Sequence, residues 1–120
     1  MNKEELARRT RRFAVGVFKL TTKFPRTESA RVVIYQLLKA ASSVAANYRA
    51  VLRAKSKADF IHKLKVVLEE ADESNFWLTF VADIELIRID DKELNILIKE
   101  STELIAIFTA SLNTLTKPKF

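Results

Sequence analysis

The sequence predicts an all-α fold, an up-down-up-down antiparallel four-helix bundle in which residues 1–120 form a single domain. Four long segments carry apolar residues at helical spacing. The links between these segments are short, which makes neighbouring helices antiparallel. One glycine and two prolines leave almost no turn chemistry. That scarcity excludes all-β folds, βαβ dinucleotide folds and phosphate-binding loops, which need glycine at tight turns.

The first helix is expected over residues 3–24. Its apolar side consists of five residues, Leu6, Phe13, Val17, Leu20 and Phe24. They fall on one face at 100° per residue. Pro25 ends the helix, because proline disfavours helical backbone in the residue before it.

The second helix is expected over residues 28–53, with Thr27 as its N-cap and a core stripe that ends at Leu52. Its opposite side carries a strip of small residues, Ser43, Ala46 and Ala50. Small side chains let another helix approach closely. The alternative is that alanine is present for helix propensity alone.

The third helix is expected over residues 57–87, where Ser56 and Asp59 resemble a capping box. It is apolar on two sides. Opposite its core stripe lies an aromatic stripe, Phe76, Trp77, Phe80, Ile84 and Ile87. A helix that is apolar on two sides must bury both, and a monomer of this size offers a core to one. The aromatic stripe therefore predicts contact with a second copy of the chain.

The fourth helix is expected over residues 91–115, after a capping pair formed by Asp90 and Glu93. Its apolar stripe is continuous from Leu94 to Leu115. The longest apolar run near the start of the chain is too short for a signal sequence, and nothing approaches a membrane span. The chain is therefore expected to be cytoplasmic.

Charge is distributed unevenly along the chain. Residues 1–65 contain 16 Lys or Arg and 4 Asp or Glu, a balance of +12, whereas residues 66–120 contain 5 and 11, a balance of −6. This asymmetry indicates an anionic partner for the first half or contact between unlike halves of neighbouring subunits. The remaining alternative is that both faces are simply solvated.

Two clusters of basic residues are the candidate nucleic-acid interface. One side of the first helix carries Arg8, Arg12, Lys19 and Lys23, and the second link gathers Arg49, Arg53, Lys55 and Lys57. Both clusters suit contact with phosphates. A basic amphipathic helix can also lie on a membrane. Here the bundle needs the apolar side of that helix, so no membrane partner is expected.

No catalytic residue, metal ligand, cofactor or small-molecule substrate is predicted. The chain has no cysteine, and its one histidine, His62, has no second histidine with which to build a di-iron site. An acidic cluster on the third helix consists of Glu69, Glu70, Asp72 and Glu73. Acid–base catalysis would require their burial. They are expected instead to be a solvated face or a surface that pairs with arginines of a neighbouring subunit.

Three stretches carry a family resemblance: residues 40–49 (AASSVAANYR), residues 56–60 (SKADF) and residues 68–74 (LEEADES). They resemble the 23S rRNA-intervening sequence protein family, small bacterial four-helix bundles also labelled S23-type ribosomal proteins. The resemblance covers about residues 10–112. The sequence departs from it at Arg49-Ala50-Val51, where many members have Ala-Glu-Gly, and this predicts a longer second helix.

The resemblance implies a ring-shaped homo-oligomer, a pentamer, and no established enzyme activity. Related accessory subunits of retroelements bind reverse transcriptase and nucleic acid. Together with the basic clusters, it predicts a non-enzymatic homo-oligomer that binds RNA, DNA or a nucleoprotein. The alternative is a structural oligomer or protein adaptor, in which the basic residues serve the subunit interface.

Overall fold

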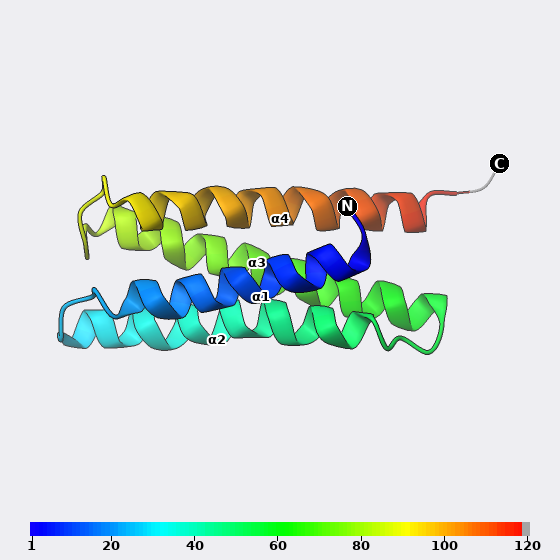
Figure 1. The fold of residues 1–120 in the computed structure, drawn as a ribbon, viewed down its shortest axis with the longest axis horizontal. Helices are drawn as coiled ribbons and strands as arrows, with labels where there is room; N and C mark the ends of the chain where they lie inside the picture. Colours follow the sequence, from blue (N-terminus) through cyan, green and yellow to red (C-terminus); the bar gives the residue numbers. More distant parts are fainter. Residues whose placement is uncertain (119–120) are drawn as a thin grey trace.

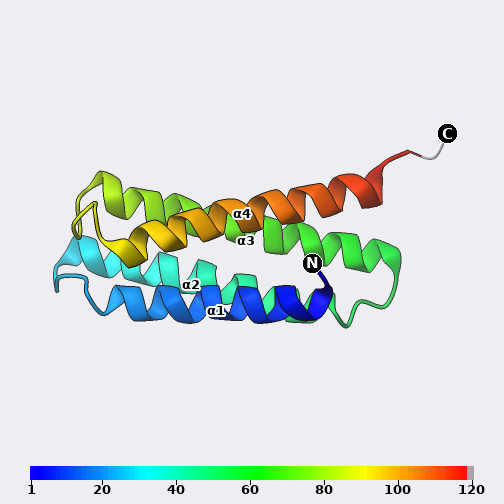
Figure 2. The ribbon, with the colours of Figure 1, turned by 45° about the horizontal axis from the view of Figure 1, so that its top comes forward.

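The computed structural model describes residues 1–118 and confirms the four-helix bundle. Its helices are α1 (Lys3–Thr21), α2 (Glu28–Val51), α3 (Lys57–Asp83) and α4 (Lys92–Thr116). They run lengthwise beside one another in a molecule that measures 52 × 24 × 22 Å. Both ends of the described chain lie at the same end of the bundle as the α2–α3 link (Figures 1 and 2).

Side-chain caps begin the helices. The Thr27 hydroxyl accepts the Ala30 N–H at 3.2 Å and the Ser56 hydroxyl accepts the Asp59 N–H at 3.0 Å, as predicted. The fourth helix is different, because Asp91 rather than Asp90 is its N-cap. Its carboxylate accepts the Leu94 N–H at 2.9 Å. The expected Asp90–Glu93 pair was therefore placed one residue too early.

Asp90 has another partner. Its carboxylate accepts two hydrogen bonds from the Arg88 guanidinium, both at 2.9 Å. This pair lies within the α3–α4 link and leaves Asp91 free to cap α4.

Three helices end earlier than expected. α1 stops at Thr21 rather than at residue 24, and α2 stops at Val51 rather than at residue 53. At the end of α1, the hydroxyls of Thr21 and Thr22 donate to carbonyls one turn back. Such bonds compete with the helical ladder, so the helix ends before Pro25 is reached.

α3 ends at Asp83, four residues before its expected end, in a Schellman motif. The Leu86 N–H donates to the Val81 carbonyl at 3.1 Å, and the Glu85 N–H donates to the Ala82 carbonyl at 3.1 Å. Glu85, which donates the second of these bonds, has a φ of 51°. Glycine is usual at this left-handed position, so helical periodicity alone gave no warning of the stop.

The core follows the predicted stripes closely. All five apolar residues predicted for α1 are buried, and Phe13 and Phe108 are the largest fully enclosed side chains. One prediction was wrong: Leu52 is 41% exposed, while its neighbour Val51 is 1% exposed. Because α2 ends at Val51, Leu52 is turned out of the stripe at the helix end.

α1 and α4 meet with the least contact of the four adjacent helix pairs. The two helices pack closely at Gly16, where an added Cβ would lie 3.1 Å from a Leu97 methyl. Ion pairs also join the two helices along this seam, the interface between α1 and α4. The Arg9 guanidinium donates to Glu100 at 2.6 and 2.7 Å and to Glu103 at 2.8 Å. The hydrogen bond with Glu100 raises the pKa of Arg9, so the guanidinium stays charged.

Replacing the left-handed residue tests the end of α3. We expect Glu85→Gly to raise the free energy of unfolding by about 0.5–1 kcal/mol, because a left-handed conformation costs an ordinary residue roughly 1–2 kcal/mol and glycine little. Glu85→Ala is the matched control and brings no gain, since alanine keeps a Cβ. Urea denaturation at one protein concentration measures both variants. Equal stability of the two variants would contradict the assignment.

Candidate nucleic-acid interface and oligomer surface

The outer side of α1 carries a cluster of unpaired cations. We call it the α1 basic face, and it consists of Arg8, Arg11, Arg12 and Lys19. All four are exposed, and with Val15 and Gly16 they line a shallow hollow. Within the described residues 1–118, none of the four has a carboxylate within ion-pair distance. Arg11 was not among the predicted residues, although its spacing of three and four residues from its neighbours places it on the same face.

Lys23 lies apart from the α1 basic face. It follows α1 in the link to α2, and its amine lies 3.0 Å from Asp91 and 3.9 Å from Glu93 at the start of α4. Of the four cations predicted on the first helix, Lys23 is therefore the one whose charge is already compensated within the chain.

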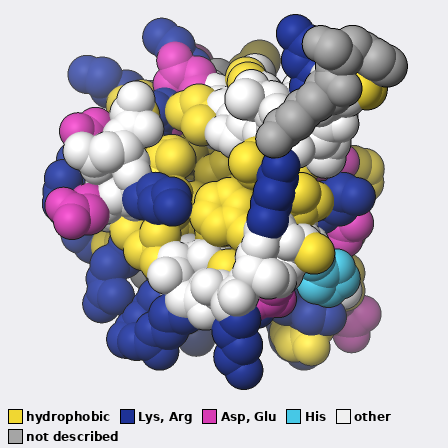
Figure 3. All heavy atoms as spheres, turned by 90° about the vertical axis from the view of Figure 1, so that its right-hand side faces the viewer, with side chains coloured by type: hydrophobic (Ala, Val, Ile, Leu, Met, Phe, Trp, Pro, Cys, Tyr) yellow, Lys and Arg dark blue, Asp and Glu magenta, His cyan; other side chains and the backbone are white. Residues whose placement is uncertain are grey.

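The second predicted cluster lies at the end of the bundle. Arg49 and Arg53 are exposed near the end of α2, and Lys55 and Lys57 are exposed at the start of α3. Figure 3 looks onto this end and shows Lys and Arg side chains around a centre of apolar ones. Because α1 begins at the same end, the second cluster lies closer to the α1 basic face than their separation in sequence suggests.

α3 carries the opposite charge. Glu69, Asp72 and Glu73 are exposed and Glu70 is half-buried. Among residues 1–118 none of these carboxylates has an ion-pair partner. In the described bundle the backbones of α1 and α3 do not lie next to each other, so the two helices occupy diagonally opposite corners. One side of the molecule is therefore basic and the diagonal side acidic.

The aromatic stripe of α3 is divided between core and solvent. Phe76 is 53% and Ile84 41% exposed, whereas Trp77, Phe80 and Ile87 pack partly against the core. The rings of Phe76, Trp77 and Phe80 pack against one another, with centroids 5.0 to 5.8 Å apart. The expectation that the whole stripe lies outside the core was therefore too broad. Phe76 and Ile84 are the two residues of the stripe that are exposed to solvent.

The outer side of α2 is also partly apolar. In the small-residue strip, Ala46 is exposed and Ser43 and Ala50 are half-buried. Sequence reasoning missed two larger neighbours on this helix, Val32 and Tyr35, which are 58% and 63% exposed. Both lie outside the core stripe at helical spacing, so the same periodicity that identified the core could have identified them.

His62 is exposed, and residues 1–118 contain no group of three or more Asp, Glu or His side chains placed to hold a metal ion. None of the four described helices is long and apolar enough to cross a membrane.

Fold and surfaces together define a small antiparallel four-helix bundle with oppositely charged sides. Within that class, residues 2–110 match the 23S rRNA-intervening sequence protein family, and the chain belongs to it. The chain is also similar to a solved structure described as a protein of unknown function from the S23 ribosomal protein family of Bacteroides thetaiotaomicron VPI-5482. The two share 28% identity over 89% of this chain and 97% of that one, with a TM-score of 0.79. No curated protein matches the chain.

The contact between Lys23 and Asp91 predicts a pH dependence of stability. The Leu94 N–H, and then the Lys23 amine, hold the pKa of Asp91 below its usual value. A lowered pKa means that this contribution is complete above the unfolded value of about 4 and is lost as the pH falls through the folded value. We expect Asp91→Asn, which keeps the capping oxygen without the charge, to be less stable at neutral pH. The difference from the native chain shrinks as the pH falls below about 4 and Asp91 becomes protonated, and urea midpoints from neutral to acidic pH measure it. A constant difference at every pH would contradict the charge effect.

Proposed function

We propose that this protein is a non-enzymatic homo-oligomer that binds RNA or DNA through the α1 basic face and the basic cluster at the bundle end. The single observation that carries the proposal is the set of four exposed cations on α1 without an acidic partner in the described chain. Unpaired Lys and Arg side chains along a straight helix suit the regular spacing of phosphates. Membership of the 23S rRNA-intervening sequence protein family is compatible with this proposal and does not itself assign a ligand.

Binding of this kind is expected to depend little on sequence. Lys and Arg contacts to phosphates set position and affinity, whereas sequence is discriminated by contacts to base edges in a groove. The α1 basic face is the surface of a helix whose other side is buried in the bundle, and its central residues, Val15 and Gly16, cannot donate side-chain hydrogen bonds to bases. The protein would therefore act as a binding or scaffolding module.

Salt dependence tests the nucleic-acid proposal. If about five phosphates are neutralised on duplex DNA, the affinity falls roughly 500-fold between 50 and 200 mM salt. Arg8→Glu/Arg12→Glu lowers the affinity at least tenfold at about 50 mM salt, because two contacts are lost and two repulsions added. The matched control, Lys65→Glu/Lys92→Glu, changes the net charge equally on α3 and α4 and leaves most of the affinity. Fluorescence anisotropy with labelled RNA and DNA is the measurement, and a native protein that binds neither at low salt ends the proposal.

Assembly is the second part of the proposal. The exposed residues of α2 combine apolar groups, Val32 and Tyr35, with basic ones, while α3 presents Phe76 and Ile84 among its carboxylates. The α2 surface is therefore complementary in charge to the α3 surface, whereas two copies of the same surface would repel each other. Their contact would be head-to-tail, which closes into a ring when the rotation per subunit allows it. The expectation of five subunits comes from the family resemblance.

Light scattering on a sizing column tests the assembly. We expect the native chain to run as an oligomer at micromolar concentration, most simply a pentamer. Phe76→Asp/Ile84→Asp should dissociate it, because burial of two large apolar side chains contributes about 1.5–3 kcal/mol each and the aspartates add charge beside Glu73. Ile96→Asp, a change at a residue of α4 that is 56% exposed, is the control and leaves the assembly intact. A native monomer would refute the proposal, and a dimer would refute only the ring.

The same variants distinguish the adaptor alternative from nucleic-acid binding. In the alternative, Arg8 and Arg12 pair with a neighbouring subunit's acidic residues, Glu69, Glu70 and Glu73, and their charge reversal dissociates the oligomer. If they bind phosphates, the oligomer remains intact while nucleic-acid binding is lost. Measuring mass and affinity on the same samples distinguishes the two cases.

A further inference from the structure

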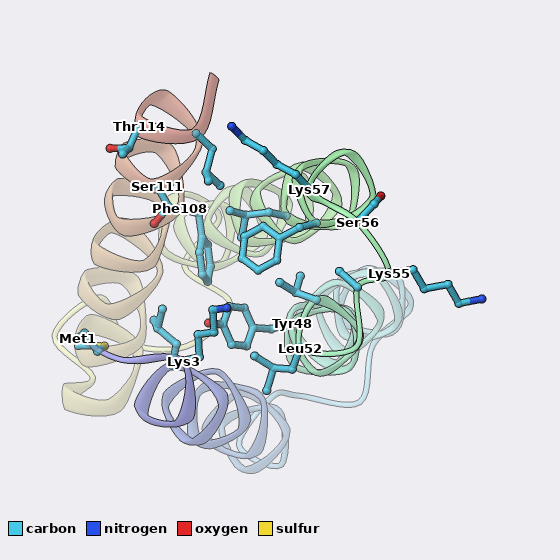
Figure 4. Close-up of a pocket in the computed structure, with 16 residues that line it drawn as sticks. Met1, Lys3, Tyr48, Leu52, Lys55, Ser56, Lys57, Phe108, Ser111 and Thr114 are labelled. Carbon is cyan, nitrogen blue, oxygen red and sulfur yellow. The ribbon is translucent and has the colours of Figure 1, made fainter. Parts of the chain in front are cut away.

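The end of the bundle that carries both described chain ends is hollow. A cavity of about 710 Å³ opens where α1 and α3 begin and α2 and α4 end. Its volume lies within the range of about 300–1,000 Å³ that is usual for small-molecule sites. In Figure 4 the labelled side chains surround this space from all four helices. Apolar residues form most of its wall, including Leu6, Leu64 and Leu115.

A hydroxyl without a protein hydrogen-bond partner lies in the wall of the cavity. The ring of Tyr48 on α2 stacks on Phe108 of α4, with centroids 5.8 Å apart. Tyr48 is 3% exposed, and its hydroxyl has no hydrogen-bond partner among residues 1–118. Burial raises the pKa of Tyr48, so the group stays protonated and can donate. The hydroxyl oxygen is not among the side-chain atoms that the protein closes off from solvent, so it faces the open space and can donate to a ligand there.

Positive charge lies at the mouth of the same cavity. The Lys3 amine lies 5.0 Å from the centre of the Phe60 ring, a cation–π contact between α1 and α3. In Figure 4 Lys57 extends from the start of α3 toward the end of α4, whereas Lys55 points outward. No Asp or Glu is among the described residues that line the cavity. The mouth therefore favours an anion.

We propose that this cavity is a binding site for a small organic anion with a flat apolar body and one carboxylate. The body would lie against the apolar wall and the Tyr48–Phe108 pair. One carboxylate oxygen would accept the Tyr48 hydrogen bond, and the amines of Lys3 and Lys57 would balance the charge. A neutral analogue keeps the apolar contacts but loses the charge, and a cation is repelled at the mouth.

This ligand class follows from the small number of polar groups. Besides Tyr48 and the lysines, the wall offers three hydroxyls, those of Ser56, Ser111 and Thr114. Ser56 already accepts the Asp59 N–H and Thr114 donates to the Ala110 carbonyl, and the described lining residues include no side-chain amide or carboxylate to match the several polar edges of a nucleobase. The cations of the α1 basic face do not line the site, although Lys55 and Lys57 of the basic cluster at the bundle end do. The proposal does not depend on nucleic-acid binding, because Arg8→Glu/Arg12→Glu changes only the α1 basic face, and the two can fail separately.

Calorimetric titration with naphthoate tests the proposal. We expect one saturable site per chain, with naphthamide, its neutral analogue, bound about tenfold more weakly or worse, since a hydrogen bond to a charged group is worth about 1.5–3 kcal/mol. Tyr48→Phe weakens naphthoate binding at least tenfold. The same variant keeps the thermal stability of the native chain without ligand, because no described residue hydrogen-bonds the hydroxyl and the ring is retained. A purely structural tyrosine would not lose binding while keeping stability.

Three further measurements complete the design. Lys3→Gln weakens binding several-fold, whereas Lys92→Gln, the same change at the other end of the bundle, has no effect. Arg8→Glu/Arg12→Glu still binds naphthoate. Amide shifts in a two-dimensional NMR titration of the native chain gather around Tyr48, Phe60 and Phe108, which gives a readout even if a variant fails to fold. Absence of saturation at millimolar naphthoate, equal affinity in Tyr48→Phe, or tighter binding of adenosine monophosphate would each overturn the proposal.

Discussion

The length of the helices is the constraint on which the rest of the structure depends. The four helices contain 19, 24, 27 and 25 residues. At 1.5 Å per residue they are about 30–40 Å long, and each must bury an apolar stripe along that whole length. Side-by-side packing satisfies this requirement and fills the interior with Phe13, Leu37, Leu78, Phe108 and their neighbours. Binding chemistry is then left to the long outer faces and to the two ends.

Chain order and topology together separate the charges in space. Basic residues come first in the sequence and acidic ones later. In the bundle the backbone of α1 lies beside those of α2 and α4 and diagonally opposite that of α3. The most basic helix and the acidic cluster therefore lie on opposite corners, and few of their charges cancel within one chain. Arg9 is the exception on α1, since it turns toward α4 and pairs with Glu100 and Glu103.

Periodicity and capping predicted the fold, the α1 core and two of the N-caps. They did not predict where α3 ends, because that stop depends on a left-handed Glu85 at a position where glycine is usual. They also assigned Phe80 and Trp77 to the exposed side, since a helical projection does not show how far a large ring can reach back toward the core. The end cavity was out of reach, because Lys3, Tyr48, Phe60 and Phe108 come from four helices and meet only after folding.

The consecutive order of the helix pairs has a consequence for how the chain folds. α1 packs on α2, α2 on α3 and α3 on α4, while the contact between the first and last helices is the sparsest. Most native contacts therefore join segments near in sequence, the low contact order that accompanies fast folding. Each hairpin can form without closing a long loop. The seam between α1 and α4 includes Gly16 against Leu97 and Arg9 against Glu100. Its formation closes the longest loop in the chain and gains the fewest contacts. It is therefore the part of the bundle that should form last and open first in local unfolding.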